Sequence, residues 1–181
     1  MPSLVGSEMC IRDSSHTQAL RHAMGGACAG KEGVGKTATV TELGTALGQW
    51  VVCLNCSNLL EPRTSAALLR GLAMSGAWGC LDEFDRIGPG MLSLFAGQLS
   101  VVLSAVRARI DWFDFEAENL PLRHGVGVFV TFSAGKYQGR HRLPHSLVAL
   151  LRPCAMTAPD LQVLATGSPM TRLKKPLQAS H

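Results

Sequence analysis

The segment Gly30-Lys-Glu-Gly-Val-Gly-Lys-Thr37 is the most informative motif of this 181-residue chain. It matches the pattern G-x-x-x-x-G-K-[ST], in which glycines allow backbone N–H groups to turn inward around phosphate groups. The lysine of this pattern reaches the outer phosphates, and the final hydroxyl is a ligand for magnesium. The residues that we predict to bind a nucleotide and its metal here are Gly30, Gly33, Gly35, Lys36 and Thr37.

The residues around this loop fit the strand–loop–helix context that the motif needs. From Thr17 we expect a strand that leads into the loop, and after it Lys36–Leu47 carries apolar residues at helical spacing before Gly48. Strands then alternate with helices, which predicts an α/β fold of the P-loop NTPase type, with a parallel sheet flanked by helices. The further expected elements are strand Trp50–Asn55, helix Arg63–Ser75, strand Trp78–Asp82, helix Pro89–Arg107, hairpin Asp111–Leu122, strand Val126–Phe132, helix Pro144–Leu151 and strand Cys154–Ala158. The apolar runs at 50–55 and 126–132 predict buried strands.

Composition limits the kind of protein this is. A chain of this length with 46% hydrophobic residues is enough for one domain with a buried core. The net charge of +4 is small and its basic residues are scattered, which argues against a nucleic-acid partner. We see no run of the roughly 20 apolar residues that a membrane span needs. Six cysteines spread through apolar segments predict a reducing, cytoplasmic location rather than a disulfide framework, and the Cys53/Cys56 pair lacks the further ligands of a zinc site.

A pair of carboxylates follows the predicted strand Trp78–Asp82, about 45 residues after Thr37. Parallel sheets bind ligands at the carboxyl ends of their strands, so Asp82 and Glu83 are expected at the same edge as the loop. This is the arrangement of a Walker B motif. We predict that Asp82 holds the hydrated magnesium and that Glu83 orients and polarises the attacking water.

Several polar residues at other strand ends remain open. Asn55 is either part of the same site or a turn former after its strand. Thr131 and Ser133 carry hydroxyls at the end of the next predicted buried strand. Arg140 and Arg152 either serve a phosphate or lie in solvent.

Three collinear segments resemble the first AAA+ module of dynein heavy chains. They are Gly25-Gly-Ala-Cys-Ala-Gly-Lys-Glu-Gly-Val-Gly-Lys-Thr37, Asn55-Cys-Ser57 and Ser75-Gly-Ala-Trp-Gly-Cys-Leu-Asp-Glu-Phe-Asp-Arg-Ile87. The likeness continues through Thr131–Arg140 and Leu150–Asp160, so it covers most of the chain.

The resemblance implies the large α/β subdomain of an AAA+ ATPase that uses ATP and Mg²⁺. It makes Asn55 the residue that positions the catalytic Glu83, Ser133 the counterpart of a nucleotide sensor, and Arg152 an arginine presented to the nucleotide of a neighbouring module. The implied function is ATP hydrolysis coupled to microtubule-based movement. The implied partners are other AAA+ modules of the same heavy chain, dynein intermediate and light chains, and microtubules. The implied location is cytoplasmic and cytoskeletal, including the ciliary axoneme, with no nucleic-acid or membrane partner.

The chain departs from the family pattern in ways that keep a second function open. Ser133 stands where the family has an asparagine, with one residue inserted after it, and Lys31-Glu32 replace small residues. Asp85 replaces the usual asparagine. The alternative is therefore a nucleotide-binding structural module that does not hydrolyse ATP. The resemblance also stops before the helical lid, the stalk and the linker, so we expect the chain alone to bind ATP weakly and hydrolyse it slowly.

The periodicity, the composition and the extent of the resemblance together divide the chain into three parts. We expect an AAA+ ATP-binding domain at 17–160, an unstructured leader at 1–16 and a disordered basic tail at 161–181. The segment 7–14 of the leader also resembles a translated sequencing-adapter string, which points to a non-native origin.

Overall fold

The computed structural model describes residues 14–56, 61–133 and 143–156. Their centre is a five-stranded sheet in which every neighbouring pair is parallel, in the order β2-β3-β6-β1-β7. The predicted α/β class is therefore confirmed. The strands are β1 (Gly25–Gly30), β2 (Val51–Asn55), β3 (Trp78–Asp82), β6 (Gly127–Ser133) and β7 (Leu151–Met156).

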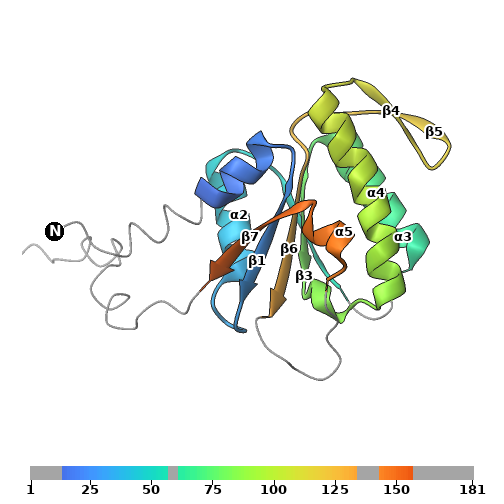
Figure 1. Cartoon of the computed structure of the whole chain (residues 1–181). Helices are drawn as coiled ribbons and strands as arrows, with labels where there is room; N and C mark the ends of the chain where they lie inside the picture. Colours follow the sequence, from blue (N-terminus) through green and yellow to red (C-terminus); the bar gives the residue numbers. More distant parts are fainter. Residues whose placement is uncertain (1–13, 57–60, 134–142, 157–181) are drawn as a thin grey trace, which may run out of the picture.

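Helices cover both faces of this sheet (Figure 1). One face carries α2 (Lys36–Ala46) together with a helix at residues 14–21. The other face carries α3 (Pro62–Ser75), α4 (Pro89–Ala108) and the short α5 (His145–Val148). A 3₁₀ turn, η1 (Phe84–Arg86), joins β3 to α4, and the antiparallel hairpin of β4 (Trp112–Phe115) and β5 (Glu118–Pro121) follows α4.

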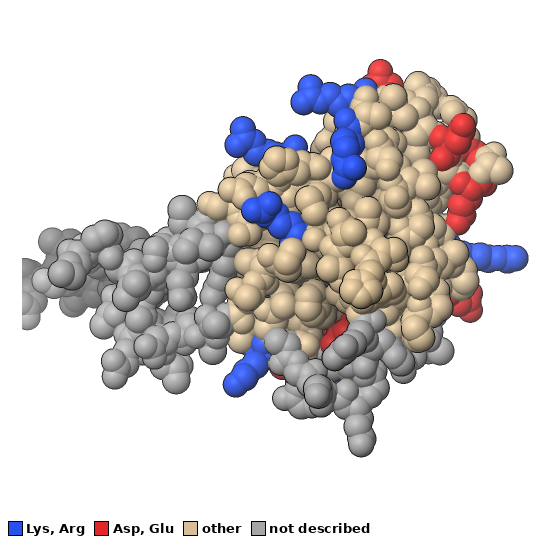
Figure 2. All heavy atoms as spheres, in the orientation of Figure 1, with Lys and Arg blue, Asp and Glu red and all other residues tan. Residues whose placement is uncertain are grey.

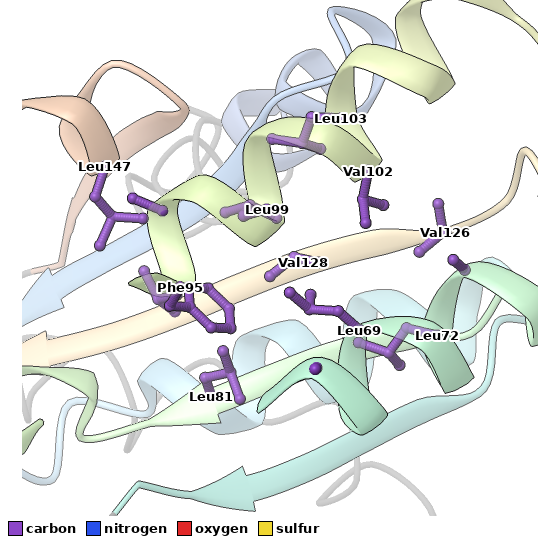
Figure 3. Close-up of a cluster of buried hydrophobic side chains, with 14 of the residues drawn as sticks. Leu69, Leu72, Leu81, Phe95, Leu99, Val102, Leu103, Val126, Val128 and Leu147 are labelled. Carbon is purple, nitrogen blue, oxygen red and sulfur yellow. The ribbon is translucent and has the colours of Figure 1, made fainter. Parts of the chain in front are cut away.

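The two faces of β6 show how the sequence builds this core. Val128 and Val130 point toward α3 and α4, whereas Phe129 lies in a second cluster with α2, as the two-residue period of a strand requires. Figure 3 shows Val128 between α4 and β3, close to Leu99 and Leu69. Burial on both faces fixes β6 as a central strand.

The element predictions hold for most of the chain. Helices α2 and α3, the hairpin of β4 and β5, and strands β3 and β6 all lie where the periodicity places them. Pro89 occupies the first turn of α4 as expected. The last strand, however, begins at Leu151 rather than at Cys154, so the predicted helix ends three residues earlier, at Val148. The predicted β7 residues beyond Met156 lie outside the described residues.

The start of the fold differs from the prediction. Residues 14–21 form a helix, and the strand begins only at Gly25. His16, which we assigned to the leader, is buried with 1% of its surface exposed, and its Nε2 lies 3.3 Å from the sulfur of Cys28. The sequence does not indicate this burial, because His16 is held by a T-shaped contact with the Phe129 ring rather than by local propensity. The remaining leader and the basic tail lie outside the described residues.

The prediction that 50–55 is a buried strand is wrong in one respect. The strand forms, but β2 is an edge of the sheet, and Val52 and Cys53 are exposed. Trp50, just before it, exposes 78% of its surface. An apolar run predicts a strand, but only the strand order decides whether a neighbour covers it.

Helix α4 is the most apolar element. Contrary to our composition-based expectation, its 20 residues reach the length and mean hydropathy, 1.5, of a membrane span. Phe95, Leu99 and Val102 on one side are buried against the sheet and α3, which is the pattern of a core helix.

Candidate functional site

The phosphate-binding loop joins β1 to α2 and takes the conformation that its glycines allow. Gly33 and Gly35 have φ values of 79° and 81°, in the left-handed region where a side chain is strained. No atom lies within 4 Å of the position of a Cβ at either residue, so the backbone there is open to an approaching ligand. The loop leads directly into the N-terminus of α2, whose dipole and free N–H groups favour an anion.

Lys36 folds over this loop. Its Nζ donates hydrogen bonds to the carbonyl oxygens of Gly30, at 3.1 Å, and of Lys31, at 2.8 Å. The ammonium group therefore lies above the same backbone that frames the expected phosphate position.

Three strand and helix ends meet at Asp82. Its Oδ1 accepts a hydrogen bond from the Thr37 hydroxyl at 2.9 Å and a second one from the Thr131 hydroxyl. The Thr131 oxygen in turn accepts a hydrogen bond from the backbone N–H of Glu83 at 3.1 Å. Thr131 is fully buried, so this network fixes the Asp82 carboxylate and the backbone of Glu83 together at the carboxyl edge of the sheet.

Glu83 lies beside this network in an unusual backbone conformation. Its φ is 52°, which is rare for a residue with a side chain and is typical of functional sites. Its Oε1 accepts a hydrogen bond from Arg86 Nη2 at 2.9 Å, and this ion pair is partly open to solvent. Arg86 therefore restrains the Glu83 carboxylate beside the cleft.

A cleft of about 450 Å³ contains most of the predicted site. It is lined by the loop, the end of β3 and the end of β6. The predicted residues that line it are Gly33, Gly35, Lys36, Thr37, Asp82, Glu83 and Ser133.

Three predicted residues lie elsewhere. Gly30 is buried at the end of β1, below the loop. Asn55 lies opposite Asp82 in the register of β2 and β3 and is exposed, and within the described part of the chain it has no hydrogen bond to Glu83. Arg152 pairs in register with Gly26 near the amino end of β1, on the edge away from the cleft, and its Nη2 donates a hydrogen bond to Gln18 at 2.6 Å. Arg140 lies outside the described residues.

Ser133 contributes through its backbone. Its N–H donates a hydrogen bond to Oδ2 of the buried Asp85 at 3.3 Å. Asp85 thus ties η1 to the end of β6, next to the cleft.

The sequence reasoning missed the roles of Thr131 and Arg86. Thr131 was only one of several hydroxyls at a strand end, and nothing local distinguishes it from Ser133. Arg86 has a signal that could have found it, because Glu83 and Arg86 stand three residues apart, a spacing that brings side chains together in a helical turn.

Two thiols close to the site are kept protonated. Burial and, less strongly, the negative charge of Asp82 raise the pKa of Cys56 to about 12. Burial also raises the pKa of Cys80, with smaller contributions from the neighbouring Cys53, Cys28 and Asp82. Neither thiol is therefore a nucleophile at neutral pH.

The donor set of the cleft fits a magnesium nucleotide. A hydroxyl and a carboxylate oxygen, from Thr37 and Asp82, lie 2.9 Å apart, and oxygen donors are what magnesium prefers. The glycine backbone, the Lys36 ammonium and the N-terminus of α2 supply the complementary groups for phosphates.

Comparison with known proteins places this geometry in a family. The family described as the hydrolytic ATP binding site of the dynein motor region matches residues 10–170. The chain is 44% identical over 148 residues to dynein axonemal heavy chain 9 of Homo sapiens. It is 45% identical to the ciliary dynein beta chain of Heliocidaris crassispina and 44% identical to the flagellar outer arm dynein beta chain of Chlamydomonas reinhardtii. These matches cover 82% of this chain but only 3% of the length of each relative.

The fold has a solved counterpart as well. A crystal structure from Cytophaga hutchinsonii, provisionally described as an ATPase, superposes with a TM-score of 0.57 at 12% identity. It covers 93% of this chain and 59% of the other. At this identity the likeness concerns the fold alone, whereas the family match and the close relatives concern the sequence itself. The chain therefore belongs to the dynein heavy chain family, in the hydrolytic ATP-binding region of its AAA+ motor.

Proposed function

We propose that this chain binds ATP with Mg²⁺ and hydrolyses it, and that in a full-length heavy chain this turnover drives microtubule-based movement. The observation that carries the proposal is the convergence of Thr37, Asp82 and Glu83 beside the phosphate-binding loop. These groups come from α2, β3 and the turn after it, and Thr131 of β6 connects them. The family match supports the same chemistry.

Different residues of the cleft bind the phosphates and the magnesium ion. Gly33 and Gly35 expose backbone N–H groups for the phosphates, and Lys36 adds a positive charge above them. Thr37 and Asp82 hold Mg²⁺, which when bound neutralises charge on the phosphates. Thr131 keeps the Asp82 carboxylate in place for this task.

The catalytic roles rest on Glu83 and its neighbours. Glu83 orients and polarises the attacking water, which requires its carboxylate to leave Arg86 and turn into the cleft. Asn55 positions Glu83 in that state, because the ends of β2 and β3 are adjacent in register. Ser133 senses the terminal phosphate from the cleft wall, and Arg152 reaches the nucleotide of a neighbouring AAA+ module from the opposite edge of the sheet.

The names of the relatives support a proposal about the wider setting. Their names are those of axonemal, ciliary and flagellar dynein chains, so we place this protein at the cytoskeleton, in a ciliary axoneme. Its partners are the other AAA+ modules of a heavy chain, the intermediate and light chains, and microtubules.

Binding and turnover of ATP can be measured separately. Wild type, Glu83→Gln and Lys36→Ala are compared in this chain and in a heavy chain with the complete ring. We expect Lys36→Ala to weaken binding of a fluorescent ATP analogue, and Glu83→Gln to keep binding while its turnover in the ring falls by about 10²-fold or more. This chain alone should bind ATP weakly and turn it over slowly, since an arginine supplied by a neighbour is worth about 10³–10⁵ in rate. Rapid magnesium-dependent turnover by this chain alone would contradict that expectation.

A second function is a nucleotide-binding structural module that does not hydrolyse ATP. The ion pair of Glu83 with Arg86 favours it, and so does the hydroxyl of Ser133 in place of an amide. Equal turnover by wild type and Glu83→Gln in the complete ring, with ATP binding intact in both, would support this function over hydrolysis.

A further inference from the structure

A second cavity lies at the end of the sheet opposite to the nucleotide cleft. Its volume is about 840 Å³, and its wall is formed by the helix at residues 14–21, the C-terminal end of α4 and the loop before β6. Helix α4 begins close to Glu83 and runs for 20 residues, or about 30 Å, so its last turn is far from the cleft. The cavity is therefore separate from the proposed ATP site.

The rim of this cavity is strongly basic. Arg21, Arg107 and Arg109 line it, together with His22 and His124. Within the part of the chain that the structure describes, none of the three arginines has a carboxylate partner. Figure 2 shows basic side chains gathered over the helix at 14–21 and the end of α4, and acidic side chains over the neighbouring hairpin.

A carboxylate beside this rim is already paired with a histidine. Asp111 pairs with His124 at 3.2 Å, and its side chain is 84% exposed. Arg107 has a structural contact, since its Nη2 donates a hydrogen bond to the Ala23 carbonyl at 3.4 Å, and it also complements the dipole at the end of α4. The side chains of Arg21 and Arg109 make no hydrogen bond within the described residues.

Arg109 is held in this position at a conformational cost. It is the C-cap of α4 and has a φ of 53°, in the left-handed region where glycine is free of strain. Non-glycine residues in that region cluster at functional sites.

The floor of the cavity combines apolar side chains with polar groups, among them Gln49 and His124. A recess of about 210 Å³ shares Leu20, Val106 and His124 with the cavity and reaches inward to Leu103 and Val126. A cationic rim above a recess that contains apolar side chains matches a ligand that has negative charge around an apolar group. A small anion would leave the recess unused, and a nucleic acid would need exposed aromatic surfaces for its bases, whereas Trp78 in this lining exposes only 2% of its surface.

We propose that this cavity binds an acidic segment of a partner protein, with one apolar side chain of the segment inserted into the recess between Leu20 and Val106. The carboxylates of the segment pair with Arg21 and Arg109. The rim charges set the rate and specificity of docking, and the recess supplies an anchor. The inference does not depend on the proposed ATPase activity.

The test uses a fluorescein-labelled peptide of alternating glutamate and leucine and measures its binding to the chain by fluorescence anisotropy. The Arg21→Glu/Arg109→Glu variant should bind it about tenfold more weakly or worse. The matched control is Arg63→Glu, which changes the charge of an exposed arginine at the start of α3, and its binding should change less than twofold. Peptides with glutamine for glutamate, or serine for leucine, should each bind more weakly than the parent.

A second variant protects the test against misfolding. Arg109→Gly removes the charge and also relieves the left-handed strain, so it should melt at a higher temperature than wild type and still lose affinity. Unchanged peptide affinity in Arg109→Gly and in the double variant would overturn the proposal. So would equal binding of the glutamine peptide, or a single-stranded oligonucleotide that binds more tightly than the peptide and displaces it.

Discussion

The buried hydroxyl of Thr131 donates a hydrogen bond to the Asp82 carboxylate and so joins the end of β6 to the end of β3. The same oxygen accepts the backbone N–H of Glu83. One side chain thus links the proposed magnesium ligand to the backbone of the proposed catalytic residue.

Replacing Thr131 by valine keeps the shape of the side chain and removes both hydrogen bonds. We expect the free energy of unfolding to fall by about 1–3 kcal/mol, because the Glu83 N–H and an Asp82 oxygen lose a buried partner. We also expect magnesium-dependent binding of a fluorescent ATP analogue to weaken by about tenfold, since 1.4 kcal/mol corresponds to a factor of ten. Thr131→Ser retains the hydroxyl and should keep most of the affinity. Equal affinities for valine and serine would show that the hydroxyl is not needed.

Arg86 restrains Glu83, so its removal should free the carboxylate. In Arg86→Gln, within a heavy chain that has the complete ring, we expect ATP turnover to rise severalfold while ATP affinity stays the same. The ion pair is partly solvent-exposed, with 48% of the Arg86 side chain accessible, so the unfolding free energy should change by less than about 1 kcal/mol. A steady-state ATPase assay and chemical denaturation measure the two effects. A fall in turnover would mean that Arg86 assists the reaction instead of restraining Glu83.

Replacing Gly35 by alanine tests whether the left-handed backbone of the loop, and not helix propensity, determines the effect on stability. Its φ of 81° strains any side chain, so Gly35→Ala should lower the unfolding free energy by about 1–2 kcal/mol and weaken ATP binding. The matched control is Gly71→Ala in α3, where a Cβ also meets no atom within 4 Å but the backbone is helical. That substitution should raise the unfolding free energy by about 0.5–1 kcal/mol. If both variants shifted the denaturation midpoint in the same direction, the left-handed strain would not be the cause.

The cysteines should differ in reactivity and should make stability depend on pH. At mildly alkaline pH, iodoacetamide should modify the exposed Cys53 in the native chain and spare the buried Cys56 and Cys80, as peptide mapping by mass spectrometry can measure.

The raised pKa of Cys56 predicts that the free energy of unfolding falls at alkaline pH. Its pKa rises from 9.0 to about 12 on folding, so the folded state keeps a proton that the unfolded state releases. Its contribution to stability is complete below about pH 9 and is lost as the pH rises toward 12. Denaturation curves recorded between about pH 9 and pH 12 should show that the free energy of unfolding falls as the pH rises. The variant Cys56→Ala should show a smaller slope of this free energy against pH. An unchanged slope in that variant would exclude Cys56 as the source.

Three features could be predicted from the amino-acid sequence: the phosphate-binding loop, the alternation of strands and helices, and the placement of Asp82 and Glu83 at a strand end. These are local features, because glycine positions, apolar periodicity and motif spacing act within a few residues of one another.

Other features depend on neighbours that are distant in the sequence, so they became visible only in the folded chain. The order of strands leaves β2 at an edge and exposes a run that is apolar enough to be buried. It places Thr131 beside Asp82, 49 residues earlier in the chain, and Arg152 on the edge away from the cleft. It also brings Arg21 to the end of α4. No local pattern encodes these contacts, because they arise from how the strands pack side by side and how the helices close over them.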